Sequence, residues 1–133
     1  MASPTATAAL AARLADPKYK AFTYIRRQVT PEEAARFGDV VLTAVPYGAL
    51  PAVGKQLAPL MKGKVVLDAS NPVPQRDGEV GVAARAKGTG VASAEYLPGV
   101  RLVRAFNSVG FGILAKETNR AGEKVAIPLA ADD

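Results

Sequence analysis

The sequence of 133 residues contains no cysteine, no histidine and no tryptophan. Without cysteine and histidine the chain can form no disulfide, no thiolate nucleophile, no zinc site of the Cys/His type and no Ser-His-Asp triad. Any chemistry must therefore rely on carboxylates, lysine, tyrosine, hydroxyls or backbone amides, or on a bound cofactor that the protein holds and orients.

Aromatic residues and long apolar runs are also scarce. The basic residues are scattered from Arg13 to Lys124 without a run longer than the pair Arg26-Arg27, and the aromatic residues number four Tyr and four Phe. This pattern disfavours nucleic-acid binding, although the net charge of +5 suits an anionic partner such as a phosphate-bearing cofactor. No stretch reaches the ~20 apolar residues that a membrane span requires. Residues 1–15 lack the basic start of a secretory signal, so we expect a cytoplasmic protein without a membrane partner.

Short apolar runs are what the sequence does contain, and four of them predict β-strands: Val40–Val45, Val65–Ala69, Arg101–Phe106 and Lys124–Ala130. The first two are continuous rather than alternating. Such runs are typical of strands that are covered on both faces, as in a parallel sheet.

Helical patterns separate these runs. Apolar residues three and four apart predict a helix from Leu50 to Met61 that ends near Gly63, and Thr30-Pro31-Glu32-Glu33 has the residues of a helix start. Weaker patterns predict an N-terminal helix, an N-terminal strand and two later helices, at Thr5–Ala15, Ala21–Ile25, Val82–Lys87 and between Val109 and Lys124. Because strand and helix alternate, we expect one α/β domain over residues 1–133 with a mostly parallel sheet.

Ligands of open α/β sheets bind beyond the carboxyl ends of the strands. The segments at those ends are Ala44-Val45-Pro46-Tyr47, Ala69-Ser70-Asn71-Pro72 and Ala105-Phe106-Asn107-Ser108. They mix small apolar groups with polar or turn-forming residues, so we predict a ligand site there.

Several of these residues also have a purely structural interpretation. Asn71-Pro72 fits a simple turn as well as a ligand contact, and Tyr47 fits a hydrophobic cap of the following helix equally well. For Asn107 we favour a functional role. Asp68 lies inside an apolar strand and should be paired if it is buried, which favours a structural network over a catalytic carboxylate.

Three strings then occur in a specific order: GDVVLTAVPYGALP at 38–51, KGKVVLDASNPVP at 62–74 and LPGVRLVRAFNSVGFGIL at 97–114, followed by VAIPLAADD at the end. From about Thr30 to Asp133 the chain resembles the Rossmann-type NADP oxidoreductases that depend on the deazaflavin coenzyme F420. One such string is a weak signal, but three in register over roughly a hundred residues are a strong one.

The resemblance implies a Rossmann-like three-layer sandwich, abbreviated at both ends, with NADP or NAD over the strand ends and a deazaflavin or flavin as hydride acceptor. It places one group of residues near the ribose and nicotinamide, Ala44, Val45, Pro46 and Tyr47, and a second group under the acceptor, Asn71, Pro72, Ala105, Phe106 and Asn107. Members of the family commonly pair, so a homodimer is a further expectation.

The chain also departs from the family pattern, because it has no G-x-G-x-x-G turn after a strand. Under this alignment Thr5–Ala15 corresponds to the helix after the family's second strand, and the family continues beyond Asp133. Gly88-Thr89-Gly90 lacks a preceding strand and is better interpreted as a loop. Two alternatives therefore stay open: a non-catalytic interaction or dimerisation module that has lost the cofactor, and a short nucleotide-binding module built on Gly88–Gly90.

Overall fold

The computed structural model describes residues 30–117 and 120–132. Its contacts divide the chain into residues 1–30 and 31–133, and all the described helices and strands belong to the second unit. The elements predicted at Thr5–Ala15 and Ala21–Ile25 lie outside the described residues, and so does the pair Arg26-Arg27.

The second unit contains a four-stranded sheet in the order β1-β2-β3-β4. β1 (Val40–Thr43), β2 (Val65–Asp68) and β3 (Arg101–Ala105) are parallel, and β4 (Leu129–Ala131) runs antiparallel to β3. The four predicted strands are confirmed, although β4 starts later than its apolar run. Its ladder begins after Pro128, which has no N–H to donate.

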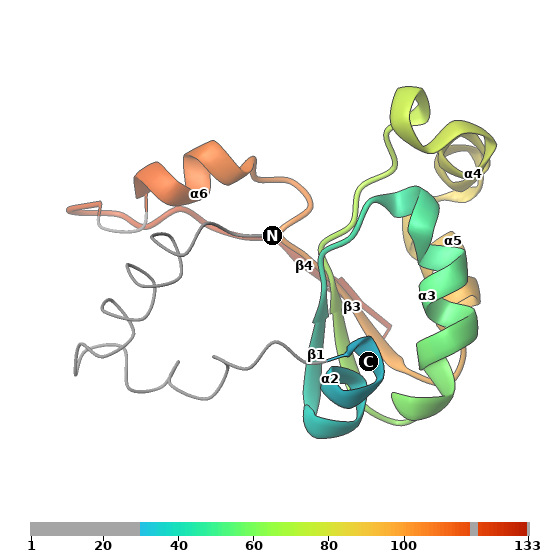
Figure 1. Ribbon diagram of the computed structural model, residues 1–133. Coiled ribbons are helices and arrows are strands. Elements are labelled where there is room, and N and C mark those ends of the chain that lie inside the picture. The colour runs from blue at the N-terminus through green and yellow to red at the C-terminus, as the bar shows by residue number, and fades with distance from the viewer. Residues whose placement is uncertain (1–29, 118–119, 133) are drawn as a thin grey trace, which may run out of the picture. The chain divides into compact units, whose positions relative to one another are not determined.

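Helices connect the parallel strands (Figure 1). The predicted helix between β1 and β2 is confirmed, and a short 3₁₀ turn flanks it on each side. The helical elements in chain order are α2 (Pro31–Phe37), η2 (Tyr47–Ala49), α3 (Leu50–Leu57), η3 (Ala58–Leu60), α4 (Pro74–Lys87), α5 (Thr89–Tyr96) and α6 (Phe111–Glu117).

Helix α4, with 14 residues, is more than twice as long as the predicted Val82–Lys87, since it starts at Pro74. Pro74 and Asp77-Gly78 are turn-forming residues, yet proline also suits the first helical turn, and an aspartate there can accept hydrogen bonds from the orphan backbone N–H groups. Gly78 then interrupts the helix with φ 58° and ψ −139°. The turn-forming pair Asp77-Gly78 therefore marks a kink within one helix.

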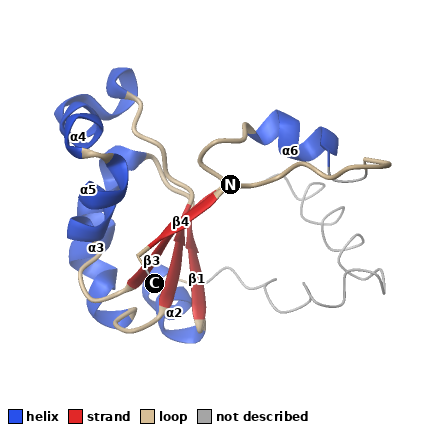
Figure 2. Cartoon of the chain, turned by 180° about the vertical axis from the view of Figure 1, so that it is seen from behind, coloured by secondary structure: helices blue, strands red, loops and turns tan. Residues whose placement is uncertain are grey.

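The core lies between the sheet and one layer of helices, where α3 and α5 cover the same face of the sheet (Figures 1 and 2). It is built from Leu50 and Leu57 of α3, Met61, Val66 of β2 and Leu97. The two helices approach very closely at Gly54, which has no side chain. A Cβ at this position would stand 1.7 Å from the carbonyl oxygen of Tyr96.

The opposite face of β1 is open. Val40 and Leu42 are each 56% exposed, so the prediction that this strand is covered on both faces is wrong. A continuous apolar run makes both faces of a strand equally apolar, but it carries no information about what packs on the second face.

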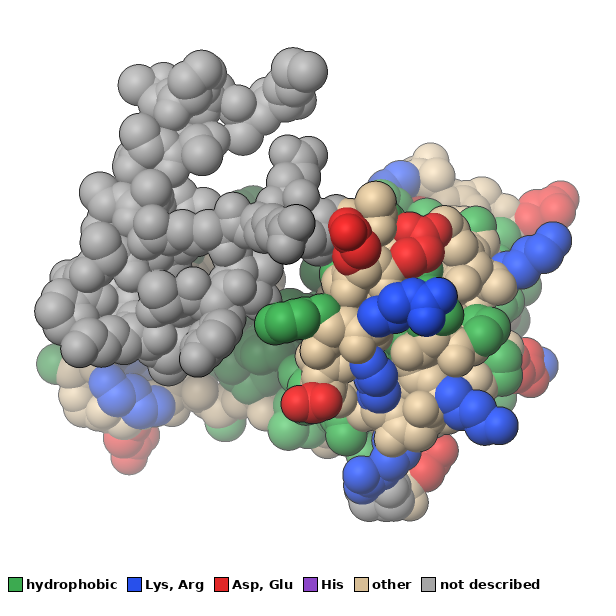
Figure 3. Space-filling model, turned by 60° about the horizontal axis from the view of Figure 1, so that its bottom comes forward, with side chains coloured by type: hydrophobic (Ala, Val, Ile, Leu, Met, Phe, Trp, Pro, Cys, Tyr) green, Lys and Arg blue, Asp and Glu red, His purple; other side chains and the backbone are tan. Residues whose placement is uncertain are grey.

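A lysine joins helix α2 to the sheet. The Nζ of Lys64 donates to the backbone oxygens of Ala35, Arg36 and Gly38 at 2.8, 3.0 and 2.8 Å. These carbonyls close the C-terminal end of α2, where a cation is favourable. On the face drawn in Figure 3, the basic and acidic side chains of the described residues are interspersed.

Candidate functional site at the strand ends

The carboxyl ends of β1, β2 and β3 lie at one edge of the sheet. Thr43, Asp68 and Arg104 pair across the three strands in the parallel register. The segments that follow them, 44–47, 69–72 and 105–107, therefore leave the sheet at the same edge, which we call the strand-end edge. The structure thus brings together the three segments that the sequence singled out.

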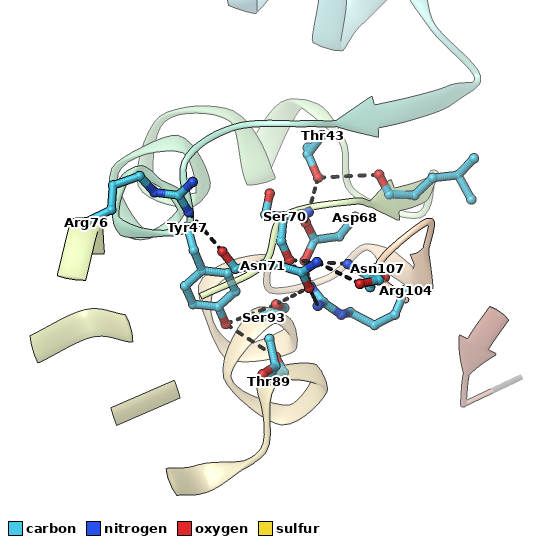
Figure 4. Close-up of polar contacts among 11 residues, drawn as sticks. Thr43, Tyr47, Asp68, Ser70, Asn71, Arg76, Thr89, Ser93, Arg104 and Asn107 are labelled. Carbon is cyan, nitrogen blue, oxygen red and sulfur yellow. Dashed lines mark hydrogen bonds and ion pairs between the residues drawn. The ribbon is translucent and has the colours of Figure 1, made fainter. Parts of the chain in front are cut away.

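A buried ion pair supports this edge (Figure 4). The Asp68 side chain is fully buried and pairs with Arg104, whose side chain is 12% exposed. Asp68 Oδ1 also accepts the backbone N–H of Ser70 at 2.8 Å and the hydroxyl of Thr43 at 3.3 Å. The expectation that Asp68 is paired is confirmed, and its partners are those of a structural carboxylate.

Arg104 connects the ion pair to the loop after β2. Its Nη1 donates to the backbone oxygen of Ser70 at 2.8 Å and to Ser93 Oγ at 3.3 Å, and its Nη2 donates to Asn71 Oδ1 at 3.4 Å. One guanidinium therefore holds groups from β2, α5 and the strand-end edge.

Asn71 and Asn107 link the second and third strand ends. Asn71 Nδ2 donates to the backbone oxygen of Asn107 at 2.8 Å, and Asn107 Nδ2 donates to the backbone oxygen of Ser70 at 3.3 Å. Asn71 is exposed and Asn107 is half-buried. Each amide thus bridges to the neighbouring loop.

Tyr47 faces the helices rather than solvent. It is fully buried, and its hydroxyl donates to the backbone oxygen of Thr89 at 3.3 Å and shares a hydrogen bond of 3.1 Å with Ser93 Oγ. Burial raises the pKa of the Tyr47 phenol. This environment favours the interpretation of Tyr47 as a cap of the following helix, and its contact with a cofactor stays a prediction.

Arg76 and Asp77, which the sequence did not single out, join the loops after β1 and β2. Arg76 Nη2 donates to the backbone oxygen of Asn71 at 2.9 Å, and Asp77 Oδ2 accepts the N–H of Val73 at 2.8 Å. Asp77 also accepts a backbone hydrogen bond from Gly48. The guanidinium of Arg76, 2.8 Å away, holds the pKa of the Asp77 carboxyl well below its usual range.

Phe106 has an unusual backbone. Its φ is 64°, the one positive value among the described residues other than glycine. A left-handed conformation costs a non-glycine residue roughly 1–2 kcal/mol. Such strain is common at functional sites, and here it turns the chain between β3 and Asn107.

The predicted site residues differ in how accessible they are. Ala44, Pro46, Asn71 and Phe106 are exposed, while Tyr47 and Ala105 are buried. The half-buried members are Val45, Pro72 and Asn107. The structure therefore leaves seven of the nine at least partly accessible at the strand-end edge.

The sequence did not single out the second member of the buried ion pair. A usable signal was present, because Asp68 and Arg104 each stand fourth in their strands, VVLD and RLVR. In parallel strands that start in register, such positions are neighbours, and Asp68, the one acidic residue of β2, matches Arg104 rather than Arg101, the other arginine of β3. Ser70 and Ser93 carried no comparable signal.

Two surface hollows lie away from this edge. One of about 370 Å³ lies over α3 and α5 and is lined by Lys55, Lys62 and Tyr96 among others, and one of about 410 Å³ lies beside Leu97 and Arg101. Gly88 has φ 97°, but Thr89 and Gly90 belong to the first turn of α5, so the prediction of a loop over Gly88–Gly90 is wrong for its last two residues.

Comparison with known proteins identifies the relatives of this chain. Residues 3–72, which are more than half of its length, match the model of a family described as NADP oxidoreductase, coenzyme F420-dependent. The chain belongs to this family. The match overlaps the resemblance seen in the sequence from Thr30 to Pro72 and adds residues 3–29 to it. Membership in the family supports the interpretation of the chain as an NADP-binding oxidoreductase domain.

A solved structure supports the fold. The chain is similar to a hypothetical protein from Sinorhizobium meliloti, with a TM-score of 0.64 and 23% sequence identity. The similarity covers 92% of this chain and 58% of the other, so the chain spans less than two thirds of that protein. The Rossmann-like α/β fold is thereby confirmed. No curated protein matches the sequence significantly.

Within residues 30–117 and 120–132, no helix has the length and apolarity that crossing a bilayer requires.

Proposed function

We propose that this chain is the NADP-binding domain of an oxidoreductase that transfers hydride between NADP(H) and a deazaflavin or flavin. The observation that carries the proposal is the convergence of three predicted segments at the carboxyl edge of a parallel sheet, where Asn71 and Asn107 are hydrogen-bonded to each other's loops. In α/β sheets this edge is where nucleotides bind. The family supports the choice of NADP.

The residues at the edge fit such a cofactor. Ala44 and Pro46 are small, exposed and apolar, so a flat ring can approach the backbone closely. Asn107 Oδ1 receives no hydrogen bond from the described residues and is free to accept an N–H of a ligand. The Arg76 side chain is 47% exposed beside Asn71, and its guanidinium is paired with Asp77.

The role of the protein in the reaction is to position the reactants. Bound NADP(H) supplies the hydride chemistry itself, which needs no general acid or base from the protein. The absence of histidine and cysteine is therefore compatible with this function. What the chain contributes is a rigid edge, in which two amides and a buried ion pair fix the loops that would hold the rings in reacting geometry.

A calorimetric titration of the full chain with NADPH and then NADH tests the proposal. We expect NADPH to bind with a Kd of order 1 μM, about −8 kcal/mol. Replacing Asn107 by Ala should weaken binding about tenfold, because one hydrogen bond is lost. Gln56→Ala removes an amide of similar chemistry from α3, outside the strand-end edge, and should leave the Kd unchanged.

Binding by the wild type should be followed by hydride transfer to a deazaflavin or flavin, monitored by NADPH absorbance. A folded chain that binds neither nucleotide would contradict the proposal and support the alternative of an interaction or dimerisation module. The apolar side chains of Val40, Leu42 and Leu129, exposed on the sheet, are the feature that favours this alternative.

The assembly state and the cellular location stay predictions. We expect a homodimer, to be checked by sedimentation of the full chain, and a cytoplasmic protein, to be checked by cell fractionation.

A further inference from the structure

We propose that Arg104 is a positioning residue that sets the orientation of the Asn71 and Asn107 amides and so makes Asn107 Oδ1 the acceptor for an N–H donor of the bound ligand. The inference rests on the proposed function. Besides forming the ion pair with Asp68, Arg104 would thereby make the site selective for ligands that carry a carboxamide or a ring N–H.

Arg104 donates hydrogen bonds in several directions. Besides Asp68 it reaches the backbone oxygen of Ser70, the hydroxyl of Ser93 and the side-chain oxygen of Asn71. A planar guanidinium with five fixed N–H groups can serve all of these acceptors, whereas an ammonium on a flexible stem cannot hold the same geometry.

Arg104 also fixes the orientation of the Asn71 side-chain amide. Since its Oδ1 accepts from Arg104, its Nδ2 is the end left to donate, and this nitrogen donates to the backbone oxygen of Asn107. The arginine therefore decides which end of the exposed Asn71 amide faces the loop after β3.

Arg104 acts on Asn107 through the backbone oxygen of Ser70. Arg104 donates to this oxygen and holds it in place, and Asn107 Nδ2 donates to the same oxygen. Because Asn107 Nδ2 donates to this oxygen, the other end of the amide, Oδ1, stays free and can only accept a hydrogen bond. A ligand with an N–H donor gains a hydrogen bond there, and a ligand that presents a carbonyl or a methyl group does not.

A comparison of matched ligands tests the inference. The wild type should bind NADP⁺ about tenfold more tightly than its 3-acetylpyridine analogue, in which a methyl group replaces the amide nitrogen. Arg104→Lys should keep the charge and lose this preference. Arg101→Lys, at the opposite end of the same strand, is the matched control and should keep it. If the N–H group that bonds Asn107 belongs to the hydride acceptor and not to NADP⁺, the wild type should prefer FMN over N3-methyl FMN. Arg104→Lys should then lose that preference.

Side-chain amide signals in the ¹⁵N NMR spectrum of the ligand-free chain provide a readout that does not depend on cofactor binding. In the wild type the Asn71 and Asn107 amide protons should exchange slowly, and in Arg104→Lys they should exchange at least tenfold faster, with the backbone spectrum of the core unchanged. Failure of the proposed function would appear as absence of nucleotide binding by the wild type, whatever these amides show.

Two results would overturn the inference: an Arg104→Lys variant that keeps both its ligand preference and its slow amide exchange, or a loss of preference with unchanged amides. Should Arg104→Lys not fold, Asn71→Ala removes the contact of Arg104 with Asn71 and the hydrogen bond from Asn71 to the loop after β3, at an exposed position. This variant should loosen the loop that carries Asn107 and weaken the ligand preference, because the backbone oxygen of Asn107 loses its hydrogen bond from Asn71. An Asn71→Ala variant that keeps the full preference and the slow exchange of the Asn107 amide would equally contradict the proposal.

Discussion

Tyr47 shows how a single residue makes this fold sensitive to alkaline pH. The phenol is buried among core residues and its hydroxyl joins η2 to α5. Burial disfavours the phenolate, so the pKa of Tyr47 is higher in the folded chain than the ordinary value of 10.0. A group with a raised pKa contributes stability below its unfolded pKa and loses that contribution as pH rises through the folded one.

We therefore expect the wild type to lose stability above pH ~10 relative to Tyr47→Phe, which has no proton to release. At neutral pH the same variant should be less stable by about 0.5–1.5 kcal/mol, because two hydrogen bonds at Ser93 and Thr89 are lost. Urea unfolding at pH 7, 9 and 11 measures both effects. A constant difference between the two proteins over this range would contradict the assignment.

At the scale of an element, the first turn of α4 is fixed by one carboxylate. The Asp77 side chain is 1% exposed and accepts from Arg76, Val73 and Gly48. Asp77 thus holds the start of the helix against η2, while Gly78 allows the rest of α4 to take another direction.

Because the pKa of Asp77 is lowered in the folded chain, its contribution to stability is present above the ordinary pKa of 3.8 and is lost as pH falls further. Asp77→Asn should accordingly be less stable than the wild type at pH 7, and the difference should shrink below pH 4. Thermal melts followed by circular dichroism at pH 7, 4 and 2.5 provide the measurement. Glu79→Gln, an exposed carboxyl of the same helix, is the control and should show a smaller effect.

The same helix shows what sequence patterns can and cannot predict. The strands followed from apolar runs, because Val and Leu in a short run have few alternatives to a sheet. Pro74 and Asp77 were ambiguous, since both residue types serve turns and helix starts alike. The choice depends on whether Gly48 and Val73 come within reach of the carboxylate, which is a tertiary property.

The strand-end edge divides in a similar way. Its three segments were predictable, because parallel strands end at one edge. The role of Arg104 was harder to predict, since its acceptors come from residues 68–71 and from Ser93 of α5, which are distant in sequence. The burial of Tyr47 was equally hidden, because an aromatic residue after a strand packs inward or faces a ligand depending on where α5 lies.

At the scale of the whole molecule, the two faces of the sheet differ in what they contribute to stability. Leu50 is fully buried in the core, whereas Leu42 is 56% exposed on the other side. Leu50→Ala should destabilise the chain by about 2–5 kcal/mol, because it removes buried methyl groups and leaves a cavity. Leu42→Ser should cost less than ~1 kcal/mol.

Urea unfolding of the full chain at neutral pH compares the two variants. A cost at Leu42 as large as that at Leu50 would show that the outer face of β1 is covered in solution, by a second copy of the chain or by another part of it. Repeating the measurement over a range of protein concentrations would separate these two cases, since only the first depends on concentration.

The contact between Gly54 and Tyr96 has a consequence for sequence variation. Since a Cβ at position 54 would collide with the carbonyl oxygen of Tyr96, even alanine has to push α5 away from α3. Ser93, which holds both Tyr47 and Arg104, is carried by that displaced helix. In a library randomised at position 54, selection for nucleotide binding should therefore return glycine almost alone, although this residue touches no part of the strand-end edge.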